Sequence, residues 1–338
     1  MNYSKEKIEE LRHRWTTPKG KSLIKVIKDS RCYLSPILFK DKVKNFPGIR
    51  DKEVEDGIDL RGAPLSGYDF RVPIQEEDEG YTEEVAILSN IHFEGALLKN
   101  CSFQEGKIHD CFFEDADLIH TQFNGATLSS CNFQEADCTG INLHGAKLIN
   151  CSFVDAHIKD IITASTIVDQ KTNFGEELKS EKEGSHHFAS IEYKQIKEMY
   201  KNSALHEISD HYHYKEMVAK RKITKRSNPM RWLNYIFGDL LTKYGTSFIR
   251  VFLASVVVVV FCAFLYTTFD SLLFHNTEVQ EPNFLSSLYF SIVTFTTLGY
   301  GDYHAVGAMR FVAASEAFIG TALTALFTVI VARHIIRD

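Results

Sequence analysis

Large apolar side chains recur at every fifth position through much of the N-terminal half. Fifteen consecutive positions keep this spacing, with one small residue at 138: Leu88, Phe93, Leu98, Phe103, Ile108, Phe113, Leu118, Phe123, Leu128, Phe133, Cys138, Leu143, Leu148, Phe153 and Ile158. A period of five is neither the 3.6-residue repeat of an α-helix nor the two-residue alternation of a strand. Phe tends to alternate with Leu or Ile, so a coil with an even number of faces would stack like residues on each other. The pattern therefore favours a solenoid with an even number of faces.

The side chains two positions before the large ones are mostly Ala or Cys, as at Ala96 and Cys101. This five-residue pattern resembles the pentapeptide-repeat family, whose fold is a right-handed β-helix of square section. We therefore predict such a β-helix over residues 58–175, with an acidic, solvated insertion at 71–85. Residues 1–57 contain helical patterns and are expected to cap its end, because the terminal coil of a solenoid needs a cover.

Two long apolar segments occupy the C-terminal third. Residues 251–269 contain no charged side chain, and residues 311–332 contain one, Glu316. Each segment is long enough to cross a hydrocarbon core of about 30 Å as a helix. We assign the two membrane spans to residues 247–269 and 308–333.

The charges around these spans predict the orientation of the chain. Basic residues gather before the first span and follow the second, whereas the segment between the spans carries acidic ones. The positive-inside rule therefore places both termini in the cytoplasm. We expect a multi-pass protein of the cell (inner) membrane.

A short apolar helix and a glycine-containing motif lie between the spans. Residues 283–296 follow Pro282 and are too few to cross a membrane, which is typical of a re-entrant helix. Next comes Thr296-Thr297-Leu298-Gly299-Tyr300-Gly301-Asp302. This order of span, short helix, T-x-G-Y-G-D and span resembles the pore unit of two-transmembrane potassium channels.

Backbone chemistry explains the residue types in this motif. Carbonyl oxygens can replace part of the water around a potassium ion. A chain that turns its carbonyls toward one axis needs backbone conformations that glycine adopts at low cost, hence Gly299 and Gly301. Irregular backbone at membrane depth is tolerated only where protein packs around it or where it lines a water-filled path. Residues 297–301 are the predicted selectivity filter.

The resemblance implies a role for each filter residue. It places K⁺ sites at Thr297, Leu298, Gly299 and Tyr300, completes the innermost one with the Thr297 hydroxyl, and packs Tyr300 outward. Leu298 replaces the more common Val or Ile, and packing behind the filter could differ as a result. The resemblance and the geometry of a closed ring together imply a homotetramer, because one loop cannot enclose an axis.

Two sets of neighbouring residues are candidates for support and gating. The residues predicted to support the filter are Thr296, Asp302 and Glu316. An ionisable group inside a span is costly. We therefore expect Glu316 to face the pore helix and to form a hydrogen bond with Ser291, Thr294 or Thr296. A structural buttress and a proton-sensitive filter gate are both open for Glu316. Gly320 is a candidate gating hinge or a close-packing residue.

The segments between the repeat and the pore are predicted to be helical. Residues 176–229 are typical of a cytosolic helical hairpin or linker, and residues 230–246 of an amphipathic helix lying at the membrane interface. The basic segment 220–231 is expected to attract membrane lipids rather than nucleic acid. We expect no nucleic-acid partner, although a cytosolic regulator of unidentified chemistry could act here.

Composition refines this picture. The chain has 338 residues, 44% of them hydrophobic, with a formal net charge of −6. That content is too apolar for a disordered chain and too polar for a protein built only of membrane spans. No nucleophile–base pair, phosphate-binding loop or metal-ligand spacing is present, so we expect neither an enzyme nor a cofactor, with K⁺ only as permeant ion. The cysteines of the repeat are interpreted as small apolar core residues.

These features predict a multidomain fold. It consists of a cytosolic right-handed quadrilateral β-helix of pentapeptide repeats, an α-helical linker and an all-α, two-transmembrane, tetrameric potassium-channel pore at residues 247–338. The predicted function is potassium-selective, passive conduction, with the repeat domain as a regulatory or assembly module. The alternative is a membrane-tethered scaffold, or a DNA-mimicking binding protein, with a non-conducting pore.

Overall fold

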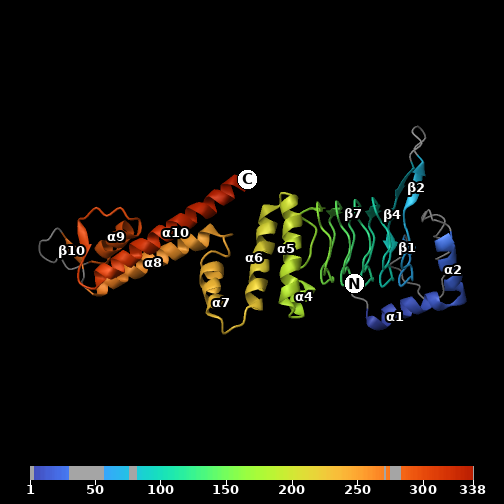
Figure 1. The fold of residues 1–338 in the computed structure, drawn as a ribbon, viewed down its shortest axis with the longest axis horizontal. Coiled ribbons are helices and arrows are strands. Elements are labelled where there is room, and N and C mark those ends of the chain that lie inside the picture. Colours follow the sequence, from blue (N-terminus) through green and yellow to red (C-terminus); the bar gives the residue numbers. More distant parts are fainter. Residues whose placement is uncertain (1–3, 30–56, 76–81, 270–271, 275–282, 338) are drawn as a thin grey trace. The chain divides into compact units, whose positions relative to one another are not determined.

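The computed structural model describes residues 4–29, 57–75, 82–269, 272–274 and 283–337 (Figure 1). The chain forms two compact units, residues 1–223 and residues 224–338. Each unit is described by itself below.

The first unit is built around a β-helix in which one coil takes 20 residues. Leu88 lies in register with Ile108, and Ile108 with Leu128, on parallel neighbouring strands. One face of the coils forms a five-stranded parallel sheet in the order β4-β6-β7-β8-β9 (Figure 1). These strands are β4 (Ile87–Ser89), β6 (Lys107–His109), β7 (Thr127–Ser129), β8 (Lys147–Ile149) and β9 (Ile167–Val168). The 20-residue register confirms the even number of faces predicted from the alternation of Phe with Leu and the square section implied by the family resemblance.

The first coil is longer than the others. Strand β1 (Ile58–Asp59) pairs with β5 (Ile91–His92) in parallel, with Ile58 opposite Ile91. Between them, β2 (Val72–Gln75) and β3 (Thr82–Val85) pair as an antiparallel hairpin. The acidic insertion predicted at 71–85 thus contains two paired strands, and its residues 76–81 lie outside the described residues.

The core of the β-helix consists of stacked side chains from successive coils. The ring centroids of Phe113 and Phe133 lie 4.8 Å apart with nearly parallel planes, and those of Phe103 and Phe123 lie 4.7 Å apart. Cys111 and Cys131 are buried in the same interior. A residue in left-handed conformation stands at each corner of the coil, five residues after the previous one, for example Asn100 and Gly125. Asn, Asp and Gly are common at these corners because they tolerate this conformation best.

The N-terminal coil is covered by helices. Helix α1 (Lys5–His13), the short helix η1 (Arg14–Thr16) and α2 (Pro18–Asp29) precede the β-helix. Arg14 pairs with Asp59, with an Nη1–Oδ2 distance of 2.8 Å, and the Trp15 indole Nε1 donates to the Arg61 carbonyl oxygen at 2.7 Å. The described part of segment 1–57 therefore packs on the first coil; the rest lies outside the described residues.

The opposite end of the β-helix is covered by a helical hairpin. Its helices are α4 (Lys179–Lys182), α5 (His186–Asn202) and α6 (His206–Ile223). The Tyr200 hydroxyl donates to the Thr172 carbonyl oxygen at 2.5 Å, and Gln195 Nε2 donates to the Ile161 carbonyl oxygen at 2.8 Å. The hairpin expected as a linker thus packs on the last coil and belongs to the same compact unit.

The second unit is helical. It contains α7 (Pro229–Leu233), the π-helix η3 (Asn234–Leu240), α8 (Phe248–Thr268), α9 (Phe284–Phe295) and α10 (Met309–Arg337). Strands β10 (Leu272–Phe274) and β11 (Tyr303–Ala305) pair antiparallel. By length and composition, Phe248–Thr268 and Met309–Arg333 can each cross a membrane, with mean hydropathies of 2.7 and 1.7.

The amphipathic helix predicted over 230–246 is shorter than expected. Helical structure continues only to Leu240, and the next residues form a turn. Lys243, Tyr244 and Gly245 all have positive φ, and the Tyr244 amide donates to the Gly238 carbonyl oxygen at 2.6 Å. Consecutive left-handed residues cannot continue a right-handed helix, so the chain turns here before α8 begins.

Candidate ion-conduction site

The candidate filter lies between the end of α9 and strand β11. Its first two amides are anchored on α9, because Thr297 donates to the Thr294 carbonyl oxygen and Leu298 to the Val293 carbonyl oxygen, both at 3.0 Å. These bonds satisfy carbonyl groups that the end of a helix leaves without intrahelical partners. The filter segment therefore starts from a fixed position on the short helix.

The backbone of the filter alternates in handedness. Thr297, Gly299 and Gly301 have φ values of +58°, +54° and +76°, whereas Leu298 and Tyr300 are outside the positive-φ region. Positive φ therefore comes at every second residue of this segment. The two glycines were predicted to take this conformation. Thr297 was not, because a β-branched residue at positive φ is strained.

Two side chains of the filter are largely exposed in the single chain. Leu298 is 61% exposed and Tyr300 is 69% exposed. The Thr297 hydroxyl donates to the Thr296 carbonyl oxygen at 2.7 Å. The ion-lining roles of these residues and the outward packing of Tyr300 stay predictions.

Asp302 and Thr296 hold the two ends of the filter differently. The Asp302 carboxylate accepts from the Tyr303 amide at 3.0 Å and interacts with the Tyr289 side chain of α9. The Thr296 hydroxyl instead donates to the Ile292 carbonyl oxygen of its own helix at 2.7 Å. Thr296 therefore stabilises the end of α9.

Glu316 joins three helices behind the filter. It is only 1% exposed. Its Oε2 accepts from the Tyr266 hydroxyl of α8 at 2.8 Å, and its Oε1 accepts from the Ser291 hydroxyl of α9. The bond to Ser291 is one of the three that we predicted. The bond to Tyr266 was missed; the only signal for it was a tyrosine within an otherwise apolar span.

Gly320 allows close contact between α10 and the end of α9. A Cβ atom at this position would collide with the backbone of Phe295, its carbonyl oxygen above all. Helix α10 continues through Gly320 without interruption. The structure therefore gives this glycine a packing role, and the gating hinge stays a prediction.

We expect Gly320→Ala to destabilise the second unit by about 1–3 kcal/mol, the usual cost of overpacking. The added methyl group must push α10 away from Phe295, which lies two residues before the filter. The midpoint of thermal unfolding in detergent measures this change. Thr321→Ala, which alters an exposed neighbour, is the control. Equal midpoints for the two variants would contradict this prediction.

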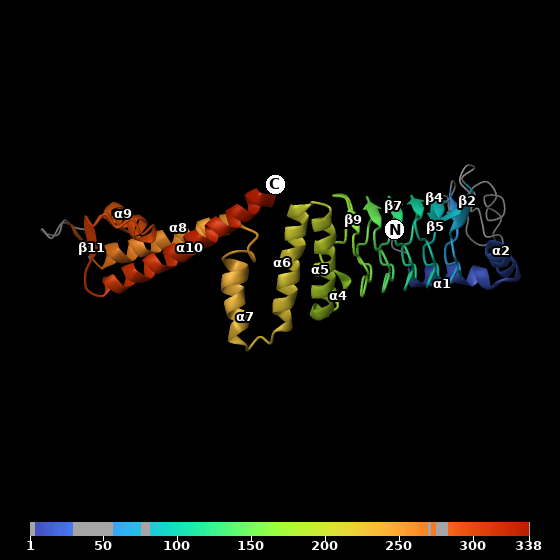
Figure 2. The same cartoon turned by 45° about the horizontal axis from the view of Figure 1, so that its top comes forward.

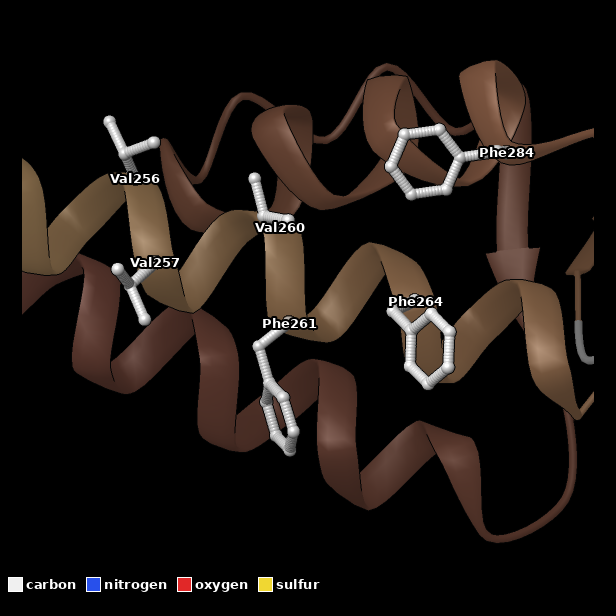
Figure 3. A pocket seen from close by; sticks show the side chains of 6 residues that line it. All are labelled: Val256, Val257, Val260, Phe261, Phe264 and Phe284. Carbon is white, nitrogen blue, oxygen red and sulfur yellow. The ribbon is translucent and has the colours of Figure 1, made fainter.

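An apolar groove lies elsewhere on the second unit. Figure 3 shows its lining: Val256, Val257, Val260, Phe261 and Phe264 of α8 together with Phe284 of α9. These six side chains carry no oxygen or nitrogen. The groove therefore offers no side-chain ligand to an ion.

Comparison with known proteins identifies both units of the chain. Residues 86–161 match the family model described as a pentapeptide repeat region, and residues 252–337 match the one described as an ion channel. The chain thus joins a pentapeptide-repeat β-helix to an ion-channel domain. With two helices long and apolar enough to span a membrane, this ion-channel domain makes the chain a membrane protein. Neither matched family is one of enzymes.

Solved structures with similarity to the chain are pentapeptide repeat proteins. HetL, involved in heterocyst differentiation regulation in the cyanobacterium Nostoc, is 20% identical with a TM-score of 0.29, over 33% of this chain and 47% of its own. A protein of the Arabidopsis thaliana thylakoid lumen is 24% identical with a TM-score of 0.23, over 30% of this chain and 59% of its own. The chain thus spans about half the length of these relatives. No curated protein matches the chain.

Proposed function

We propose that this ion-channel domain is the pore of a homotetrameric, potassium-selective channel. The observation that carries the proposal is the positive φ at every second residue of 297–301, between two helices able to span a membrane. In the proposed pore, this alternation turns successive carbonyl groups toward one axis. Rings of such carbonyls replace the hydration shell of potassium. Both termini lie in the cytoplasm of a cell whose inner membrane holds the channel.

The proposed K⁺ ligands are the carbonyl oxygens of Thr297, Leu298, Gly299 and Tyr300, with the Thr297 hydroxyl at the innermost site. Four copies are needed because one such segment cannot surround an ion. The exposed Leu298 and Tyr300 of the single chain are then covered by neighbouring subunits.

Flux from liposomes tests the proposed function. Purified protein is reconstituted into vesicles loaded with K⁺ or Na⁺, and a pH-sensitive dye reports the proton movement that balances ion efflux through a proton carrier. We expect rapid efflux of K⁺ and little efflux of Na⁺. Native mass spectrometry in parallel is expected to find four copies of the 38.5 kDa chain. Equal K⁺ and Na⁺ efflux, or a monomer, would contradict the proposal.

The β-helix and its hairpin are proposed to regulate or assemble this pore from the cytosol. The basic segment 220–231 is proposed to meet anionic lipid headgroups. Two of its lysines already pair within the first unit, Lys220 with Glu216 at 2.5 Å and Lys222 with Glu181 at 2.6 Å. The proposed lipid contact therefore centres on Lys225 and Arg226, which follow α6.

A further inference from the structure

Two carboxyl side chains lie next to each other on adjacent coils of the β-helix, away from the pore. Glu94 follows Phe93 and Glu114 follows Phe113, and the Gly95 amide donates to the Glu114 carbonyl oxygen at 2.8 Å. The equivalent positions on other faces of the coils, such as Lys99 and His109, are exposed. Nevertheless Glu94 is only 4% exposed and Glu114 only 7% exposed.

Each carboxyl group has a hydrogen-bond partner on one oxygen only. Glu94 Oε1 lies 2.9 Å from Nδ1 of His92, and Glu114 Oε1 accepts from Nδ2 of Asn132 at 2.5 Å. The second oxygen of each, Oε2, is buried and has no hydrogen-bond partner among the described residues. Buried polar atoms are normally satisfied, so two neighbouring orphan oxygens indicate that a ligand belongs here.

The cap helix α1 covers this part of the β-helix. Arg12 Nε donates to the Gly95 carbonyl oxygen at 2.9 Å, and a Cβ at Gly95 would lie 3.0 Å from the Ile8 side chain. Figure 2 shows α1 running beside the first coils. Gly95, the residue after Glu94, is thus in direct contact with the cap. Release of α1 would therefore expose the surroundings of Glu94 to water.

The charged groups nearest the pair come from the preceding coil and from the cap. Asp59 and Arg61 lie on the preceding coil, where Asp59 is in register with His92, and Arg14 comes from the cap. The guanidinium groups of Arg14 and Arg61 are both buried and pair with Asp59. Arg12 of the cap lies on the other side, where it donates to the Gly95 carbonyl oxygen beside Glu94. Two neighbouring buried carboxylates are costly when both are ionised, and one bound proton removes the repulsion between them.

Other titratable groups near the pair are more exposed. Asp115 and Glu135 occupy the neighbouring corner of the coils and are partly exposed. On the following coil, Asn132 and Gln134 are neutral. Asp59 stays ionised: although burial alone would raise its pKa, hydrogen bonds from Arg14 and Arg61 hold that pKa well below the usual range. The added proton thus belongs to the Glu94–Glu114 pair.

We propose that Glu94 and Glu114 form a proton-binding site that links docking of the α1 cap on the β-helix to pH. The pair holds one proton when the cap is docked. It loses that proton when the cap leaves and both carboxyl groups regain water. This proposal concerns the first unit and stands apart from conduction by the pore.

The direction of the pH effect follows from the folded-state pKa. Burial first, and then the charge of Glu94, raise the pKa of Glu114 from 4.5 to about 7. The docked state then binds more protons than the released state between these two values. Docking is strongest at low pH, weakens as pH rises through about 7, and changes little above that.

The fluorescence of Trp15 tests the proposal in the full chain. Trp15 is buried in the cap, and Trp232 is the other tryptophan of the sequence. In the Trp232→Phe background, Trp15 emission during urea titration in detergent therefore reports cap release. We expect the equilibrium constant for release to be roughly tenfold larger at pH 8 than at pH 6, as one proton linked through a pKa near 7 requires.

Two substitutions separate this site from general effects of pH. Glu114→Gln, a neutral mimic of the protonated form, should remove the difference between pH 6 and pH 8. Glu105→Gln, which changes an exposed carboxyl group of the same β-helix, should keep it. If Glu114→Gln does not fold by circular dichroism, Glu94→Gln serves in its place. It removes the charge that adds to the effect of burial on the pKa of Glu114, so the difference between pH 6 and pH 8 should shrink.

Three results would overturn the proposal. The first is equal cap release at pH 6 and pH 8 in the Trp232→Phe background. The second is an unchanged pH response after neutralisation of either glutamate. The third is tightening of the cap at pH 8 by millimolar calcium to the level seen at pH 6, because the pair would then be a metal site.

Discussion

Gly299→Ala is expected to abolish potassium conduction while leaving the tetramer assembled. Gly299 has a φ of +54°, and alanine in left-handed conformation costs roughly 1–2 kcal/mol per residue. Four copies surround one ion path in the proposed channel, so the strain is applied four times. The backbone escapes it by rotating the peptide groups next to residue 299, which turns a ring of carbonyl oxygens away from the ion. We expect potassium flux to fall at least tenfold.

The effect of this substitution would be conformational rather than steric. A Cβ at Gly299 meets nothing within 4 Å in the single chain. Gly307 is a matched control, since it also has positive φ, +57°, and open space around its Cβ, yet it lies outside the filter. Gly307→Ala should carry similar local strain and retain the flux. Equal loss of flux in both variants would indicate a general defect of folding and contradict the filter assignment.

Glu316→Leu is expected to destabilise the ion-channel domain, whereas Glu316→Gln should retain most of its stability. Leucine leaves the buried Tyr266 hydroxyl without its acceptor. It also removes one of the two acceptors of the Ser291 hydroxyl. The other acceptor, the Val259 carbonyl oxygen at 2.8 Å, remains. A buried hydroxyl that loses its partner costs about 1–3 kcal/mol. Glutamine keeps the shape and can accept from Tyr266 through its own carbonyl oxygen.

The unfolding midpoints of the two variants in detergent measure this difference. The buttress interpretation predicts a lower midpoint for Glu316→Leu and a nearly wild-type midpoint for Glu316→Gln. Flux at several pH values then separates the two roles of Glu316. A gate predicts that Glu316→Gln changes the pH dependence of flux, whereas a buttress predicts no change. A Glu316→Leu variant as stable as the wild type would contradict both.

The sequence allowed the β-helix and the candidate filter to be predicted because each is encoded locally. The alternation of Phe with Leu reports which side chains stack, and the structure has the expected 20-residue coil. The left-handed residues at Gly299 and Gly301 follow from the motif and from the freedom of glycine. Thr297 could not be found in this way, because its own preferences oppose the conformation that the anchored end of α9 imposes.

Contacts between distant segments could not be predicted. Tyr266 meets Glu316 only through the rotation of α8 against α10, which no local pattern specifies. Glu94 and Glu114 occupy solvent-facing positions of the repeat and become buried near the contact of Gly95 with the cap. The hairpin was recognised as helical, yet nothing in its own sequence indicated that Tyr200 would bond the last coil of the β-helix.

The reversal potential with potassium on one side of a planar bilayer and sodium on the other tests the central claim most directly. The proposed filter predicts a potential close to the potassium limit in the wild-type protein and in Gly307→Ala. In Gly299→Ala we expect either no current or loss of that preference. A wild-type reversal potential near zero would contradict the account, because residues 297–301 would then not discriminate potassium from sodium.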